Sequence, residues 1–147
     1  MKLIEQQFFT GERALFHSED LHLVRSTFAD GESPLKESRN IDLEQSIFKW
    51  KYPLWYCHNI KVDNSILLET ARSGIWYTDT ISITNSTIEA PKTFRRAKNI
   101  TLKSVHMPHA SETLWNCDTI RLDDVTAAGD YFGMNSQNVI QEVFGLA

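Results

Sequence analysis

The chain has 147 residues, of which 41% are hydrophobic, and its formal net charge is −4. A chain of this length and composition can bury a core without disulfides or metal ions, so we expect a single domain over residues 1–147. Its 15 basic residues are scattered rather than gathered into a stripe, which argues against nucleic acid as a partner.

A repeat of about twenty residues runs through the chain. Its mark is the phrase Asn-Ile-x-Leu or a relative of it, and we call the first apolar residue of that phrase the anchor. Successive anchors lie 19 to 21 residues apart, at Leu21, Ile41, Ile60, Ile81, Ile100, Ile120 and Val139. So short and regular a period indicates one supersecondary unit stacked on copies of itself.

Each repeat is expected to open with a short strand. A polar and then an apolar residue follow each anchor, as in Ile41-Asp42-Leu43, and this alternation is typical of a strand with one buried face. Small polar pairs come next, among them Gln45-Ser46, Asn64-Ser65 and Asn85-Ser86. Such pairs suit a backbone corner, so we expect a second strand after them.

The residues before each anchor predict a third wall. Six places before the anchor stands a large apolar residue: Leu15, Leu35, Leu54, Ile75, Phe94 and Leu114. Three places before it stands a small residue: Ser18, Ser38, Cys57, Thr78, Ala97, Cys117 and Ser136. This alternation fits a narrow, filled interior. Three walls in about twenty residues make one coil of an all-β parallel β-helix, and we predict six to seven coils.

The two ends of the rod are expected to differ from its middle. Residues 1–20 are predicted to form an N-terminal coil and cap, and residues 138–147 an incomplete last coil, because Gln141 fills a place that is apolar elsewhere. An uncovered last coil would expose unpaired backbone groups. We therefore expect this end to be disordered, covered by a helical turn, or paired with a second subunit in a homo-oligomer.

Two features predict a cytoplasmic location. No apolar run follows Met1-Lys2, so we expect neither a signal peptide nor a membrane-spanning helix. Cys57 and Cys117 fall on one ladder three coils apart, roughly 14 Å by strand spacing. A disulfide needs Cα atoms within about 7 Å, so both cysteines are expected to be small buried residues.

Two neighbouring ladders are the best candidates for a functional surface, and we call them together the aromatic–basic strip. Five places before the anchor stand Phe16, Lys36, Trp55, Trp76, Arg95, Trp115 and Met134. Four places before it stand His17, Glu37, Tyr56, Tyr77, Arg96, Asn116 and Asn135. Rings interleaved with charges suit an extended glycan, with its rings stacked and its carboxylates held by arginine. Stacked rings could equally serve only to stabilise the solenoid.

For the binding interpretation, the predicted ligand residues are Lys36, Trp55, Tyr56, Trp76, Tyr77, Arg95, Arg96, Trp115 and Asn116. The partner would be a glycan or polysaccharide, or else a protein. The alternative is a carbohydrate-active enzyme, of the polysaccharide-lyase or glycosidase kind, in which Glu37 acts with Arg95 or Arg96. No cofactor and no metal site is predicted. His106 and His109 lack a third ligand at useful spacing, and we expect His106 to be a hydrogen-bonded core residue.

Several strings of this sequence resemble those of a known family. They include Gly31–Ser38, Phe48–Cys57, Gly74–Tyr77, Phe94–Arg96 and Glu112–Cys117. The chain is similar, over residues 1 to roughly 140, to an uncharacterised family of bacterial right-handed β-helix proteins, a domain of unknown function whose fold is similar to that of pectin lyases. The resemblance implies a right-handed helix and no particular activity. It does not carry over a calcium-dependent lyase site, because the corner ladder Gln45, Asn64, Asn85, Ser104, Asp124 has one acid.

Overall fold

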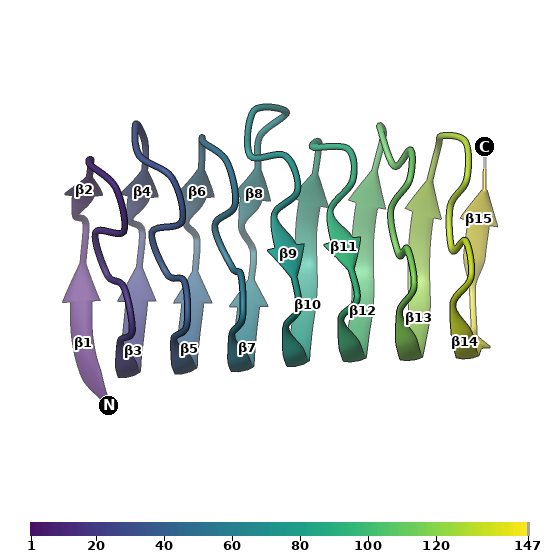
Figure 1. Cartoon of the computed structure of the whole chain (residues 1–147), viewed down its shortest axis with the longest axis horizontal. Coiled ribbons are helices and arrows are strands. Elements are labelled where there is room, and N and C mark those ends of the chain that lie inside the picture. The colour runs from purple at the N-terminus through teal and green to yellow at the C-terminus, as the bar shows by residue number, and fades with distance from the viewer. Residues whose placement is uncertain (147) are drawn as a thin grey trace.

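The computed structural model describes residues 1–146 as a parallel β-solenoid that coils along one long axis (Figure 1). Residues 1–146 contain no helix, and so none with the length and apolarity needed to cross a membrane. The strands, in chain order, are β1 (Lys2–Glu5), β2 (Phe8–Phe9), β3 (Glu19–Val24), β4 (Thr27–Phe28), β5 (Arg39–Glu44), β6 (Ile47–Phe48), β7 (His58–Asp63), β8 (Ile66–Leu67), β9 (Ile75–Trp76), β10 (Asp79–Ile88), β11 (Phe94–Arg95), β12 (Lys98–Met107), β13 (Asp118–Ala127), β14 (Gln137–Gln141) and β15 (Phe144–Leu146).

The anchors pair with one another, one coil to the next. Leu21 pairs with Ile41, and Ile41 with Ile60, in parallel register. This confirms the parallel solenoid. The first wall contains eight strands within the described residues, namely β1, β3, β5, β7, β10, β12, β13 and β14. The predicted number of six to seven coils is therefore too low, because Lys2 takes the anchor place of the first coil and pairs with Leu21.

The first and second walls are separate strands in some coils and joined in others. In the first four coils the first wall and the second wall, which consists of β2, β4, β6 and β8, are separate strands. In β10, β12 and β13 they join into single strands of ten residues, and in the last coil they are separate again as β14 and β15. Within residues 1–146, the third wall forms a regular ladder only between β9 and β11, where Phe94 pairs with Ile75 and Arg95 with Trp76.

Each coil turns at four places where the backbone is left-handed. In the coil of Ile60, positive φ angles occur at Tyr52, Tyr56, Asn59 and Asn64, which lie eight, four and one places before the anchor and four places after it. Among the non-glycine residues described, Leu114 is the one positive-φ residue outside these four places. Asparagine tolerates this conformation better than most residues, which explains its frequency at the corners.

The interior is filled by apolar ladders and closed at one corner by hydroxyl groups. The rings of Phe9, Phe28 and Phe48 stack at 5.0 Å and 4.8 Å between neighbouring centroids. Beside them runs a buried serine ladder, in which the backbone N–H of Ser46 donates to Oγ of Ser65 at 3.1 Å. The Oγ of Ser65 in turn donates to the carbonyl of Asp63 at 2.9 Å. The polar pairs therefore form the predicted corner.

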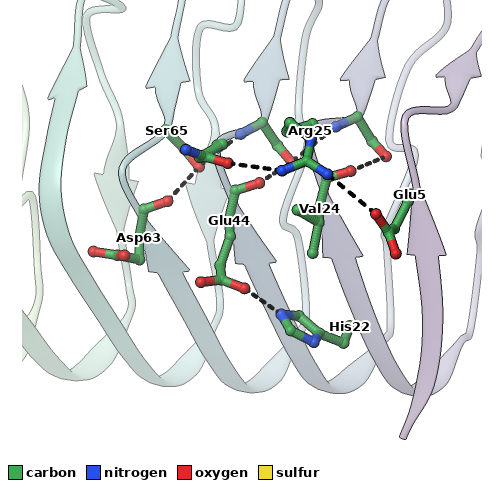
Figure 2. A network of polar contacts seen from close by, with 10 residues as sticks. Glu5, His22, Val24, Arg25, Glu44, Asp63 and Ser65 are labelled. Carbon is green, nitrogen blue, oxygen red and sulfur yellow. Dashed lines mark hydrogen bonds and ion pairs between the residues drawn. The ribbon is translucent and has the colours of Figure 1, made fainter.

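Ion pairs and hydrogen bonds run across coils on the outer face beside this corner. Figure 2 shows Arg25 between the coils that carry Glu5 and Glu44, with its guanidinium 3.1 Å from the Glu5 carboxylate. His22 lies 2.5 Å from the carboxylate of Glu44. These groups are about half exposed, so each such pair contributes little to stability.

The last coil contributes two strands to the sheet. β14 and β15 both pair with β13, and no helical turn covers the part of this end that the structure describes. Val139, Ile140 and Val143 are exposed there. Ala147, which belongs to the predicted last coil, lies outside the described residues. Pairing with a second subunit stays a prediction.

Both cysteines are buried and free. Burial raises the pKa of Cys57 to about 12 and that of Cys117 to about 11. We therefore expect the thiols of the folded protein to react with a disulfide reagent at pH 8 at least about a hundredfold more slowly than those of the denatured chain, since the thiolate is the reactive form. Absorbance of the released chromophore measures both rates. Equal rates in the two states would contradict the buried positions.

Candidate functional site

The aromatic–basic strip lies along the third wall, and its residues are neighbours in space as predicted. The backbone N–H of Tyr56 donates to the carbonyl of Trp76 at 3.0 Å. That of Tyr77 donates to Arg95 and that of Arg96 to Trp115, each at 2.9 Å. Equivalent side chains of successive coils are therefore held in line by the backbone itself.

The central rings of the strip stack on one another. The indoles of Trp55 and Trp76 lie 4.9 Å apart with 7° between their planes, and the phenols of Tyr56 and Tyr77 lie 4.7 Å apart, also at 7°. The guanidinium of Arg95, one coil further on, lies 5.1 Å from the Trp76 ring centroid. Trp76 thus has Trp55 against one face and Arg95 against the other.

The indole N–H groups are also used within the protein. Nε1 of Trp55 donates to the carbonyl of Ser73 at 2.6 Å, and Nε1 of Trp76 donates to that of Lys92 at 3.0 Å. With its faces covered and its N–H bonded, Trp76 cannot stack a sugar ring. These contacts favour the structural interpretation for Trp55 and Trp76, where the stack stabilises the third wall.

A pocket opens where an arginine replaces a ring in the ladder. It has a volume of about 170 Å³ and is lined by Ser73, Trp76, Lys92, Arg95, Glu112 and Trp115, and we call it the Arg95 pocket. Nζ of Lys92 lies 3.5 Å from the carboxylate of Glu112, which leaves the pocket with a net positive charge from Arg95. Within residues 1–146, no other ring and no cation stacks on Trp115.

The backbone beside this pocket is strained. Leu114, directly before Trp115, is buried and has a φ of 59°. A bulky residue in this region costs about 1–3 kcal/mol, and such strain gathers at functional sites because only a surrounding structure that fixes it can retain it. The distortion interrupts the third wall, where only a single bridge joins Arg95 to Trp115.

A second hollow lies nearer the N-terminal end of the strip. It has a volume of about 400 Å³ and is lined by His17, Lys36, Glu37 and Tyr56, and we call it the Lys36 hollow. Nζ of Lys36 lies 5.9 Å from the Tyr56 ring centroid. Glu37 belongs here, three coils and roughly 14 Å from Arg95 by strand spacing. The structure therefore does not bring Glu37 and Arg95 into one site.

The remaining site predictions have mixed outcomes. Arg96 lies exposed on the ladder four places before the anchors, and Asn116, in the next coil, accepts a hydrogen bond from Nδ2 of Asn135 at 2.5 Å. Neither residue lines the Arg95 pocket. Ser73 and Lys92 were not predicted as site residues. Both lie eight places before their anchors, on a ladder that runs beside the strip. Their place could have been found by counting back three residues from Trp76 and Arg95.

The histidine prediction was wrong. His106 is exposed on the outer face of β12, where its Nδ1 bonds Oγ1 of Thr126 at 2.5 Å. In the part of the chain that the structure describes, no three His, Cys, Asp or Glu side chains lie close enough together to hold a metal ion.

Comparison with known proteins gives a family. Residues 2–146 match the profile of a family described as "Protein of unknown function (DUF3737)". No curated protein matches the chain. Among solved structures, one from Parabacteroides merdae, described as a "putative glycosyl hydrolase", is similar at 11% identity with a TM-score of 0.49, over 99% of this chain and 81% of that one.

Proposed function

This chain belongs to the DUF3737 family of proteins of unknown function, and we propose that it is a binding module that holds an acidic carbohydrate in the Arg95 pocket. The observation that carries the proposal is the break in the ring stack. Where Arg95 stands in place of an indole, the stack leaves a cationic pocket that Trp115 also lines.

The pocket supplies the groups that recognition of a uronate sugar needs. Arg95 presents planar donors that match a carboxylate, and Lys92, which is paired with Glu112, adds further N–H donors. Trp115 offers an apolar ring face to the sugar ring, and Glu112 offers oxygens that accept hydrogen bonds from hydroxyl groups. Because the stack is already formed in the free protein, little ordering entropy is lost on binding.

An enzyme that uses Glu37 together with Arg95 or Arg96 is the weaker proposal. A glycosidase places two carboxyl groups within about 10 Å of each other on the two sides of the reacting bond. Glu37 lies outside the Arg95 pocket, and Glu112 is the one carboxylate that lines it. One carboxylate paired with a lysine suits binding better than acid–base catalysis.

Titration calorimetry with a uronate hexasaccharide tests the proposal, with a neutral hexasaccharide as the ligand control. We expect the wild-type protein to bind the uronate and not the neutral sugar. Trp115→Ala and Arg95→Gln should each weaken binding at least about tenfold, which is 1.4 kcal/mol. Trp50→Ala is the matched control, because Trp50 is an exposed indole outside the pocket.

Two outcomes would overturn the proposal. One is the absence of uronate binding by the wild-type protein. The other is binding by Trp115→Ala that equals that of Trp50→Ala, with both variants as folded as the wild type by circular dichroism.

A further inference from the structure

We infer that the ligand is a linear polyuronate that lies along the rod axis and occupies the Lys36 hollow and the Arg95 pocket at the same time. This inference rests on the proposed function and adds the ligand's length, its direction and a second contact point. It comes from the placement of the two hollows on one strip.

The cations of the two hollows stand on one ladder. Lys36, Trp55, Trp76 and Arg95 occupy the same place in four successive coils, linked through backbone hydrogen bonds from the neighbouring ladder. At the strand spacing of a β-sheet, Lys36 and Arg95 are roughly 14 Å apart. A monosaccharide cannot reach both groups, whereas an extended chain of several sugars can.

The surface between the hollows can carry such a chain. Tyr56 and Tyr77 are 50% and 37% exposed, although their rings stack on each other. Their outward edges and hydroxyl groups form a polar rim along the axis. A chain that passes over this rim would meet hydrogen-bonding groups rather than a barrier.

The strip and the ladder eight places before the anchors together carry a charge opposite to that of the whole chain. At the places eight, five and four before the anchors, the cationic residues are Arg13, Lys36, Lys92, Arg95 and Arg96, and the anionic ones are Glu37 and Glu112. This face therefore carries an excess of positive charge on a protein of net charge −4. An anionic polymer would be steered to this face and repelled by the others.

The chemistry favours carboxylates over phosphates as the anionic groups. Proteins that bind nucleic acid through its backbone typically neutralise about 6–10 phosphates, and this strip offers fewer cations, spaced at coil intervals. Arginine beside the Trp115 indole matches a planar carboxylate on a sugar ring. Nucleic acid is therefore the competing ligand that the experiment has to exclude.

Two contact points on one chain make affinity depend on ligand length. Once one uronate occupies the Arg95 pocket, the Lys36 hollow meets the other end of the same chain at a high effective concentration. Chains too short to span the two hollows gain nothing from Lys36. Affinity should therefore rise sharply at the length that first spans them.

The test is calorimetry with oligogalacturonates from the dimer to the octamer. We expect the octamer to bind the wild-type protein at least about a hundredfold more tightly than the dimer, as tethering of a second site allows. Lys36→Gln should remove most of this gain, so that its affinities for octamer and dimer differ by less than about tenfold. Lys61→Gln, an exposed lysine on the first wall, is the matched control and should change neither.

Each outcome separates the two claims. If no oligomer binds at any length, the proposed function is wrong. If dimer and octamer bind with the same affinity, or if Lys36→Gln behaves like Lys61→Gln, the pocket binds sugars but the inference of an axial polymer is wrong. If single-stranded DNA of equal charge binds as tightly as the octamer, the inference is overturned in favour of nucleic acid.

Discussion

Replacing Phe48 with alanine should lower the free energy of unfolding by about 3–5 kcal/mol. Phe48 is completely buried, and its ring stacks on that of Phe28 at 4.8 Å and 9°. On the other side it is paired with Leu67 of the next coil. Because a β-solenoid is held at a fixed strand spacing by its backbone hydrogen bonds, the coils cannot close over the cavity.

Urea unfolding followed by circular dichroism measures this loss. Phe8→Ala is the matched control, since Phe8 is 65% exposed on the first coil and its removal should change the free energy by less than about 0.5 kcal/mol. Such a domain has only about 5–15 kcal/mol of stability, so Phe48→Ala should shift the midpoint visibly. Equal midpoints for the two variants would show that the phenylalanine stack is not the core of these coils.

The solenoid could be predicted because each coil buries the same places. An anchor such as Ile60 has a like residue above and below it, so the burial requirement repeats with the period of the coil. The sequence pattern weakens where a neighbour is missing. At the first described coil the exposed Lys2 takes the anchor place. The pattern of apolar anchors therefore does not reveal this coil.

The error at His106 has a related cause. Its place, six after the anchor, is filled by Ile47 and Ile66 in other coils, which suggested an inward ladder. Both isoleucines are in fact partly exposed on the outer face. β-Branched residues are favoured in strands on either face, so residue type alone does not separate inside from outside at such a place.

The strip could be predicted as a ladder, but the pocket in it could not. Sequence periodicity places Trp55, Trp76 and Trp115 in one line, and the structure brings them there. Where the ladder opens into a pocket depends on how Arg95 folds over its neighbour. The strain at Leu114 is also invisible in the sequence, since leucine is a residue that avoids the left-handed conformation.

Replacing Ser65 with alanine should lower the free energy of unfolding by about 1–3 kcal/mol, although it removes only one oxygen atom. The hydroxyl accepts the backbone N–H of Ser46 and donates to the carbonyl of Asp63. Ser46 and Ser65 are both buried, so the alanine variant leaves the Ser46 N–H without a partner and without water. The cost comes from that desolvated donor rather than from lost packing.

Ser82→Ala is the matched control for this prediction. Ser82 lies on the outward face of β10, in the coil after Ser65, and is only half buried. Its loss should change the free energy of unfolding by less than about 0.5 kcal/mol. Amide hydrogen exchange supplies a second readout, because the Ser46 amide should lose protection in Ser65→Ala and keep it in Ser82→Ala. If Ser65→Ala is no less stable than Ser82→Ala and the Ser46 amide stays protected, this amide has another partner and the serine ladder does not hold the corner.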